Sequence, residues 1–358
     1  FTSARSLDPE RVLLLAPSWI GDVVMATPTF RSLRERFAHA RITLAVRRNA
    51  RPVLDDAPWF DEVIETTDAE KGFFGTCRLV KRLRAGRFEL GVLFANSFRT
   101  ALVARLARVG RVLGYRRDCR GMLLTDRLEP PREGRRLVPT PALDYYLELA
   151  RYFDADVSNR SMQLFYRDAV ARAFDDYARR RGIDFSRRVV VMNPGASFGS
   201  SKCWPVEHYA VAADLLAARG DVQVVVICAP SERELARDVA RAAQSDVVSL
   251  HEEPAGLDLL KVLIDRAALL VTNDTGPRHF AAVFDTPVVT VFGSTHPRWS
   301  DTGFARERIV RIDVECAPCQ LKRCPIDHRC MTLLKPELVV EAVRELLDAR
   351  PARPRGEG

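Results

Sequence analysis

The stretch VLLLAPSWIGDVVMATP, residues 12–28, sets the expected fold, because a short apolar run is followed at once by a glycine, an acid and a helical pattern. The run VLLL is typical of a strand buried in a parallel sheet. Asp22 then lies just beyond the carboxyl end of that strand, where open α/β sheets bind their ligands. A first-turn aspartate also stabilises a helix, and residues 23–33 have a helical pattern. Asp22 is therefore either such a helix acid or a residue placed for chemistry.

The same alternation of strands and helices continues along both halves of the chain. Strands are predicted at 42–46, 62–65 and 90–94, and again at 189–192, 222–228, 268–272 and 287–292, with helical patterns between them. This alternation predicts an α/β protein with two doubly wound domains, which would face each other across a cleft. The expected divisions are a first domain at 1–165, a linker region at 166–186, a second domain at 187–334 and a C-terminal amphipathic helix at 335–349.

Composition and charge narrow the class of protein. The 358 residues suffice for two domains, and the 47% hydrophobic fraction is typical of a globular chain. No apolar stretch approaches the roughly 20 residues that cross a bilayer, and the first ten residues lack an apolar signal core, so a cytoplasmic protein is expected. The net charge of +8 favours a polyanionic partner, either nucleic acid, an anionic membrane surface or a phosphorylated substrate.

Arginines gather between positions 99 and 136, most densely in YRRDCRG at 115–121. Arginine is common on solvated helix faces, which would account for part of this group. A loop with several guanidinium groups instead favours bidentate binding of phosphate.

Two segments of the second half have the composition of anion sites. NPGASFGSSKCWP (193–205) follows a predicted strand and supplies glycines, hydroxyls and Lys202, although the spacing of a Walker loop is absent. VTNDTGPRHFAAVF (271–284) places Thr275 and Gly276 at the positive end of a helix. A solvated lysine and a plain helix cap are the simpler interpretations. A glycine in the first helical turn costs stability, which favours close approach of a ligand.

Two further features leave their roles open. Glu232 follows the strand at 222–228, where an acid can accept hydrogen bonds from ribose hydroxyls or stabilise a first helical turn. The segment CAPCQLKRCPIDHRC gathers Cys316, Cys319, Cys324 and Cys330 beside His328. This composition resembles a zinc knuckle, but its spacing is tighter than in common structural zinc sites, so free thiols in a structural loop or a facultative disulfide are the competing interpretations.

Taken together, six ordered segments resemble the ADP-heptose:lipopolysaccharide heptosyltransferases, glycosyltransferase family nine, and most closely the heptosyltransferase II branch. They are SWIGDVVMATPTFRSL, LFANSFRTALVARL, GYRRDCRGMLLTD, NPGASFGSSKCWP, NDTGPRHFAAVF with TPVVTVFGSTHPRW, and the cysteine segment. The resemblance runs from about residue 11 to about residue 347. It implies the GT-B architecture, with the acceptor on the first domain, ADP-heptose on the second, and the last helix packed back on the first domain.

The resemblance also implies an inverting transfer of L-glycero-D-manno-heptose to the heptose of the lipopolysaccharide inner core. Asp22 corresponds to the base, and Lys202 to the group that stabilises departing ADP. The expected donor-binding residues are Ser197, Ser200, Lys202, Glu232, Asp274, Thr275, Gly276 and His279. The expected acceptor-binding residues are Gly21, Asn96, Ser97, Arg99, Arg116, Arg117 and Arg120.

The same resemblance indicates no required cofactor, with stimulation by Mg²⁺ left open, and no metal at the donor site. The phosphates and carboxylates of the acceptor would be held at the cytoplasmic face of the inner membrane, where the enzyme would be peripheral. Heptosyltransferase I, or a family-nine transferase with another glycan acceptor, is the nearest alternative. A nucleotide- or nucleic-acid-binding protein without transferase activity is the alternative from another class.

Overall fold

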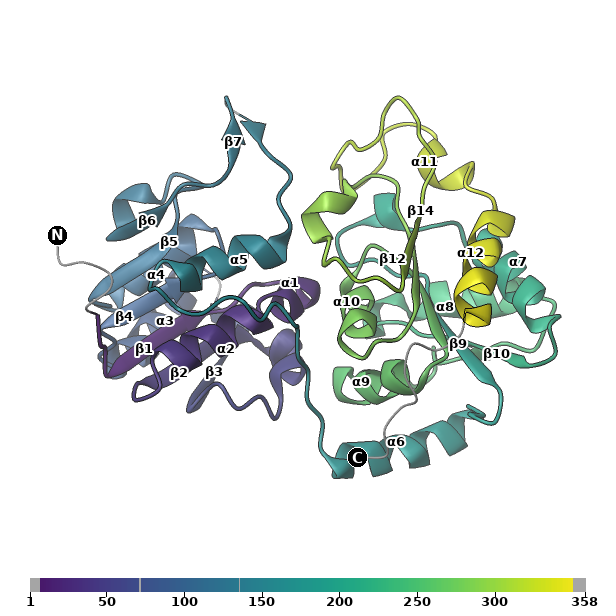
Figure 1. The fold of residues 1–358 in the computed structure, drawn as a ribbon, viewed down its shortest axis with the longest axis horizontal. Coiled ribbons are helices and arrows are strands. Elements are labelled where there is room, and N and C mark those ends of the chain that lie inside the picture. Colours follow the sequence, from purple (N-terminus) through teal and green to yellow (C-terminus); the bar gives the residue numbers. More distant parts are fainter. Residues whose placement is uncertain (1–6, 71, 135, 350–358) are drawn as a thin grey trace. The chain divides into compact units, whose positions relative to one another are not determined.

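The computed structural model describes residues 7–70, 72–134 and 136–349, which divide into two compact α/β units (Figure 1). Unit 1 takes the described chain up to Phe165 together with Arg298–Thr302. Unit 2 takes Tyr166–Pro297 and the described chain from Gly303 onward. The predicted class, an α/β fold with two doubly wound units, is confirmed.

Unit 1 is built on a six-stranded parallel sheet in the order β3-β2-β1-β4-β5-β6. Its strands are β1 (Arg11–Leu15), β2 (Arg41–Arg47), β3 (Glu62–Thr66), β4 (Leu90–Leu93), β5 (Arg111–Tyr115) and β6 (Asp126–Leu128). Leu14 of the central strand is opposite Leu44 on one side and Val92 on the other. Because helices cover both faces of this sheet, its strands are apolar on both sides.

Helices cover the two faces of the unit 1 sheet, and a short hairpin extends from it. The helices are α1 (Ile20–Met25), α2 (Thr27–Arg36), α3 (Gly72–Ala85), α4 (Phe98–Leu106) and α5 (Ala142–Arg151), and the hairpin pairs β7 (Arg132–Glu133) with β8 (Arg136–Leu137). The helices α1 and α2 pack with α5, whereas α3 packs with α4. Leu79 and Leu83 of α3 join the core that Leu13 and Leu15 form on their face of the sheet.

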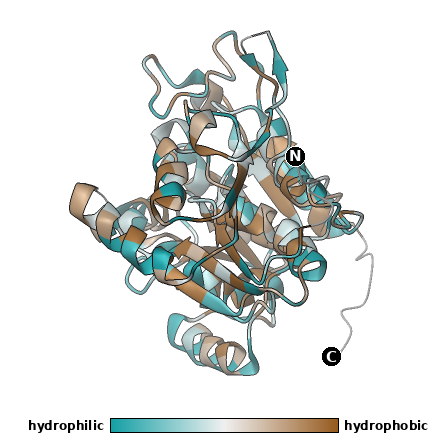
Figure 2. Cartoon of the chain, turned by 90° about the vertical axis from the view of Figure 1, so that its left-hand side faces the viewer, coloured by the Kyte–Doolittle hydropathy of each residue, from teal (hydrophilic) through white to brown (hydrophobic). Residues whose placement is uncertain are grey.

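Unit 2 repeats the design with the strand order β11-β10-β9-β12-β13-β14, again all parallel. Its strands are β9 (Arg188–Asn193), β10 (Val222–Val226), β11 (Val248–Ser249), β12 (Leu269–Asn273), β13 (Val288–Val291) and β14 (Glu307–Val310). Its helices are α6 (Asp168–Arg181), α7 (Val206–Ala217), α8 (Arg233–Ala242), α9 (Leu257–Arg266), α10 (Gly276–Val283), α11 (Arg329–Thr332) and α12 (Pro336–Asp348). Figure 2 shows the hydrophobic residues concentrated along the strands.

Two expectations about the domain divisions need correction. Residues 166–186, expected to be a linker, contain α6, which packs against α9 within unit 2. The last helix, expected to pack back on the first domain, is α12, whose buried Val339, Val340 and Val343 belong to the core of unit 2 together with residues of α7 and β13. The amphipathic pattern correctly predicted an apolar face, but a pattern does not specify which core receives it.

The order of strands places one ligand-binding edge in each unit. Chain order reverses between β1 and β4 in unit 1 and between β9 and β12 in unit 2. Loops that leave the carboxyl ends of strands on either side of such a switch point diverge and leave room for a ligand. Asp22 and Asn96 follow β1 and β4, and Lys202 and Asp274 follow β9 and β12. Within the described ranges, no helix combines the length and apolar character that crossing a membrane requires.

Candidate active site

Asp22 lies in the first turn of α1, directly after β1, and is partly exposed. Its backbone carbonyl accepts a hydrogen bond from the Ala26 amide at 2.9 Å. Burial raises the pKa of the Tyr146 phenol well above its ordinary value, and the negative charge of Asp22 adds to this rise. The carboxylate therefore lies near Tyr146 of α5, at the binding edge of the unit 1 sheet. Gly21 precedes it in the same turn and is also partly exposed.

Arg120 has a different position from the one expected. Its side chain is fully buried and donates hydrogen bonds to the carbonyl oxygens of Ala95 and Tyr115 and, at 2.9 Å, to Asn96 Oδ1. Tyr145 also donates to Asn96 Oδ1, at 3.2 Å. Burial lowers the pKa of Arg120 to about 10, so the guanidinium remains charged at neutral pH. The expectation that Arg120 contacts the acceptor is corrected, because this arginine ties together the loops after β4 and β5.

The other expected acceptor residues are at the surface of unit 1. Ser97 caps α4 by accepting the Thr100 amide, and Arg99 is exposed. Arg116 and Arg117 line a hollow of about 550 Å³ together with Arg127 and Arg132. Four arginines around one hollow form a region suited to phosphate or carboxylate groups. The sequence did not indicate that arginines from this loop and from the later hairpin would line the same hollow.

In unit 2 the two predicted anion segments meet at one place. Lys202 Nζ donates hydrogen bonds to Asp274 Oδ2 at 2.6 Å and to the Asp274 carbonyl at 3.0 Å, and it lies 5.0 Å from the ring centre of Phe198. Thr295 donates to the same carboxylate oxygen at 2.9 Å. Burial alone would raise the pKa of Asp274, but Lys202 and Arg278 lower it to about 2. Asp274 is thus a buried carboxylate that holds the lysine.

The loops that carry these groups are tied together by Asn193 and Asn273, neither of which was among the expected site residues. Asn193 ends β9 and donates to Thr275 Oγ1 at 2.9 Å, which fixes the residue that precedes α10. Asn273 ends β12, donates to the Pro194 carbonyl at 2.8 Å and accepts the Trp204 amide at 3.1 Å. A polar residue at the end of each apolar strand was the available signal. These contacts place Thr275 and Gly276, at the positive end of α10, beside the Lys202 loop.

Glu232 lies against the first of these loops. Its Oε2 accepts the Ala229 amide at 3.2 Å, and a Cβ added to Gly195 would collide with its carboxylate group. Burial and the charge of Glu232 raise the pKa of the nearby Cys203 thiol to about 11. Glycine at 195 therefore allows the Glu232 carboxylate to approach the loop closely. Ser197 is exposed in the same loop, and Ser200 is exposed in the 3₁₀ turn of Lys202.

A buried ion pair behind Asp274 was not predicted. Arg278 of α10 donates to both carboxylate oxygens of Glu307 of β14, at 2.5 and 2.8 Å, and Thr290 donates to Glu307 Oε1 at 2.5 Å. Arg278 Nη1 is 3.5 Å from Asp274 Oδ1. Charges of alternating sign therefore run from Lys202 through Asp274 and Arg278 to Glu307. Arg278 and Glu307 are 29 positions apart, so no local pattern joined them.

His279 is buried next to this network. Among the described residues, its Nδ1 has no hydrogen-bond partner. Burial, followed by the neighbouring Arg278, lowers the pKa of His279 far below its ordinary value, so the imidazole is neutral at pH 7. A neutral ring can pack beside the ion pair without adding a third positive charge.

The cysteine segment supports the turn that carries Lys202. Ser201 Oγ donates to the Leu321 carbonyl at 2.5 Å, the Ser201 amide donates to the Lys322 carbonyl at 3.2 Å, and His328 Nε2 lies 2.9 Å from the Ser201 carbonyl. Cys330 is buried in the core of unit 2, whereas Cys316 is exposed. Within the described parts of the chain, no group of three or more His, Cys, Asp or Glu side chains is arranged to hold a metal ion.

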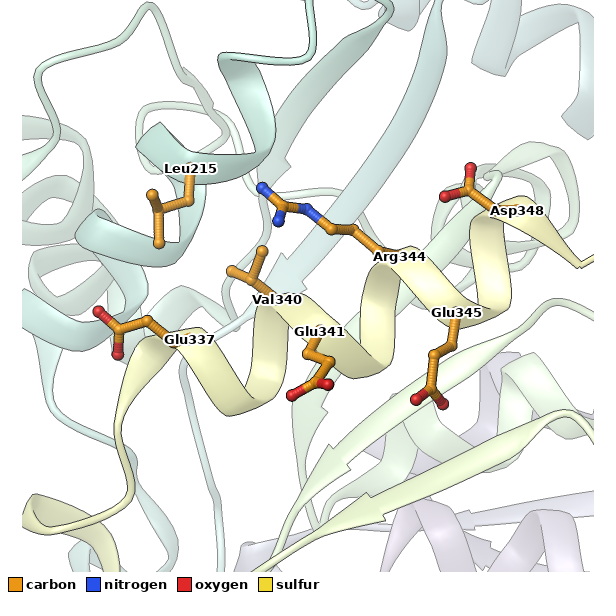
Figure 3. Close-up of a pocket in the computed structure, with 7 residues that line it drawn as sticks. All are labelled: Leu215, Glu337, Val340, Glu341, Arg344, Glu345 and Asp348. Carbon is orange, nitrogen blue, oxygen red and sulfur yellow. The ribbon is translucent and has the colours of Figure 1, made fainter.

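A second hollow, this one in unit 2, has an acidic lining that does not suit a diphosphate. Figure 3 shows it between α7 and α12. Its lining includes Glu337, Glu341, Glu345 and Asp348. Four carboxylates against the single Arg344 give the hollow a net negative lining that would repel an anionic donor, so this hollow is not a candidate for the donor site.

Two doubly wound α/β units, each with polar residues at its switch point, are the architecture of the GT-B glycosyltransferases. The chain belongs to glycosyltransferase family 9 (heptosyltransferase), whose model matches residues 76–329. Family membership decides against the alternative of a nucleic-acid-binding protein without transferase activity.

Named relatives agree with this assignment over most of the chain. Lipopolysaccharide heptosyltransferase 2 of Escherichia coli K12 is 28% identical over 313 residues, which cover 84% of this chain and 88% of the relative. Lipooligosaccharide heptosyltransferase 2 of Haemophilus influenzae is 24% identical, with 94% and 99% covered. The solved structure of E. coli ADP-heptose lps heptosyltransferase II is similar with a TM-score of 0.76 and 25% identity, over 94% of this chain and 98% of that one.

Proposed function

We propose that this chain transfers L-glycero-D-manno-heptose from ADP-heptose to the heptose of the lipopolysaccharide inner core, with inversion at the anomeric carbon. The observation that carries the proposal is the Lys202–Asp274 pair beside the first turn of α10. A lysine ammonium and helix amides at one point are a combination suited to the phosphates of a nucleoside diphosphate sugar. The relatives named heptosyltransferase 2 support this donor and this acceptor.

In the proposed reaction, Asp22 accepts the proton of the acceptor hydroxyl as its oxygen attacks the anomeric carbon. The bond from that carbon to the β-phosphate oxygen breaks, and ADP leaves with the bonding electrons. Lys202 and the amides of Thr275 and Gly276 stabilise the charge that develops on the β-phosphate. Glu232 accepts hydrogen bonds from the ribose hydroxyls, and Asp274 holds Lys202 and orients the donor. Protein groups thus supply the stabilising charge, so no metal is required in this proposal.

The acceptor is anionic, and the surface of unit 1 suits it. Arg99, Arg116 and Arg117 would bind its phosphates and carboxylates, with Asn96 and Ser97 beside the sugar. The lipid-linked acceptor places the reaction at the cytoplasmic face of the inner membrane, where we propose that the protein is peripheral.

The test is heptose transfer from ADP-heptose to mono-heptosylated Kdo₂-lipid A by wild type, Asp22→Asn and the matched control Glu35→Gln on the exposed side of α2. We expect Asp22→Asn to bind ADP normally in calorimetry but to lose about a hundredfold or more in turnover, with the control unchanged. If the wild type binds ADP-heptose but ignores this acceptor, the acceptor is another glycan. If it binds no ADP-sugar, the proposed donor site is wrong.

A further inference from the structure

Among the residues of unit 1 that the structure describes, the most exposed aromatic side chains lie together at one end of α3. Phe73 and Phe74 are 77% and 81% exposed, and their ring centres are 5.5 Å apart in an edge-to-face arrangement. Soluble surfaces carry isolated apolar residues without consequence, but two adjacent phenylalanines at the tip of one helix form a protruding apolar contact. None of the roles assigned above uses them.

The remainder of α3 shows which way this end faces. Gly75, Leu79 and Leu83 are buried against the unit, with Gly75 packed on the backbone of Glu70. At about 3.6 residues per turn, the opposite side of the helix presents Phe74 together with Lys81. The outward side of α3 is therefore aromatic at its first turn and basic beyond it.

Basic residues predominate around the aromatic pair. α3 contains no acidic residue, and its basic residues are Arg78, Lys81, Arg82 and Arg84. The acids of the preceding turn are already paired, Asp68 with Arg47 at 2.8 Å and Glu70 with Arg82 at 2.9 Å. With Arg82 paired to Glu70, the other basic residues of α3 and its aromatic tip complement an anionic lipid surface, where the rings occupy the interface and the cations meet the headgroups.

This end of α3 also adjoins an expected acceptor residue. Arg99 of α4 donates to the Glu70 carbonyl at 2.5 Å and lies 3.4 Å from Thr76 Oγ1. A bilayer that receives Phe73 and Phe74 would therefore lie next to Arg99, the arginine proposed above to bind the lipid-linked acceptor.

We propose that Phe73, Phe74 and the basic side of α3 form a membrane-docking tip that inserts into an anionic bilayer surface; the link to catalysis rests on the function proposed above. Two phenylalanines bury roughly 300–500 Å² of surface, well short of the roughly 1,200 Å² of a stable protein dimer. The same area is sufficient to anchor a helix at a lipid interface when basic residues add electrostatic attraction.

The experiment is co-sedimentation of the full chain with vesicles of phosphatidylcholine alone or mixed equally with phosphatidylglycerol. The variant is Phe73→Ser/Phe74→Ser, and the matched control is Ile326→Ser/Leu333→Ser, which removes two apolar side chains that are 57% and 60% exposed on unit 2. We expect wild type and control to bind the mixed vesicles, and the phenylalanine variant to bind at least about tenfold more weakly. Equal binding of variant and wild type, or equal binding to both vesicle types, overturns the proposal.

Two further measurements distinguish membrane docking from the proposed transferase function and from dimer formation through the same surface. Transfer to an acceptor embedded in vesicles should fall for the phenylalanine variant, whereas transfer to the same glycan freed of its acyl chains should not change. If neither acceptor is used by wild type but vesicle binding still depends on Phe73 and Phe74, the proposed function fails and the docking tip stands. Light scattering that shows a wild-type dimer and a variant monomer would assign this surface to a second copy and overturn the proposal.

Discussion

Removal of the Glu307 carboxylate is expected to destabilise unit 2 severely. The Arg278 and Glu307 side chains are only 2% and 8% exposed, and the two form a bidentate pair within the unit. Glu307→Gln keeps the size of the side chain but removes the bidentate partner of the buried Arg278 guanidinium, and the Asp274 carboxylate is more distant, 3.5 Å from Nη1. Breaking a buried pair in this way costs about 3–5 kcal/mol, and solvent screening reduces this little because the two side chains are almost fully buried.

Thermal unfolding measures the loss of stability that Glu307→Gln causes. A unit of this size loses about 2–4 °C of melting temperature per kcal/mol, so Glu307→Gln should lower the transition of unit 2 by roughly 6–20 °C. Calorimetry of the full chain, with the fluorescence of the buried Trp204 as a reporter of unit 2, measures this shift. Asp285→Asn is the matched control, because it breaks the Arg306–Asp285 pair, whose side chains are 29% and 63% exposed. That pair should contribute about 0–1 kcal/mol.

A double variant makes the reasoning refutable. Arg278→Met/Glu307→Leu removes both charges, so it should recover most of the stability that Glu307→Gln loses. If Glu307→Gln shifts the transition no more than Asp285→Asn, the pair does not behave as a buried charge pair. A double variant that is no more stable than the single one would show that the pair contributes net stability and does not merely balance two buried charges.

Gly195→Ala should weaken ADP binding about tenfold in calorimetry, because the added methyl group displaces Glu232, and unchanged affinity would remove Glu232 from the ribose site. The pKa of His279 is lower in the folded protein than in the unfolded chain, so as the pH is lowered the unfolded chain binds a proton at this histidine before the folded protein does. The free energy of unfolding therefore decreases as the pH is lowered below about 6.5, by up to about 1.4 kcal/mol per pH unit. Urea unfolding between pH 7 and 5.5 should show a smaller loss for His279→Gln than for wild type, and identical slopes would contradict this assignment. Iodoacetamide at neutral pH should label the exposed Cys77 well before Cys203, because the pKa of the Cys203 thiol is raised to about 11. Peptide mass spectrometry measures the two labelling rates. Faster labelling of Cys203 would show that its thiol is not shielded.

The sequence predicted those parts of the fold that depend on local pattern. The runs VLLL and VVVM are strands because both of their faces are covered, and NDTGPR begins a helix at the edge of the sheet. The position of Asp22 after β1 followed from the same pattern, and the resemblance to family 9 supplied the role of base that we propose for it. The secondary structure that a short run of residues adopts can therefore be predicted from the sequence alone.

The parts that failed depend on distant partners. Arg120 was expected to bind the anionic acceptor because its loop gathers several guanidinium groups, but the carbonyls of Ala95 and Tyr115 accept its hydrogen bonds. Arg278 was not expected in the site because its partner Glu307 is on another strand. Such contacts depend on the order of strands, which the sequence pattern does not specify.

The position of α12 has a consequence for how the protein is made. Unit 1 consists almost entirely of the first 165 residues, so nearly all of its core can form while the ribosome is still producing the remainder. Unit 2 obtains Val339, Val340 and Val343 from the last helix, so its core stays incomplete until that helix is synthesised. A nascent or truncated chain that stops before Pro336 lacks α12, so the side of the unit 2 sheet that this helix covers stays exposed to solvent. Such a chain is a substrate for chaperones and proteases.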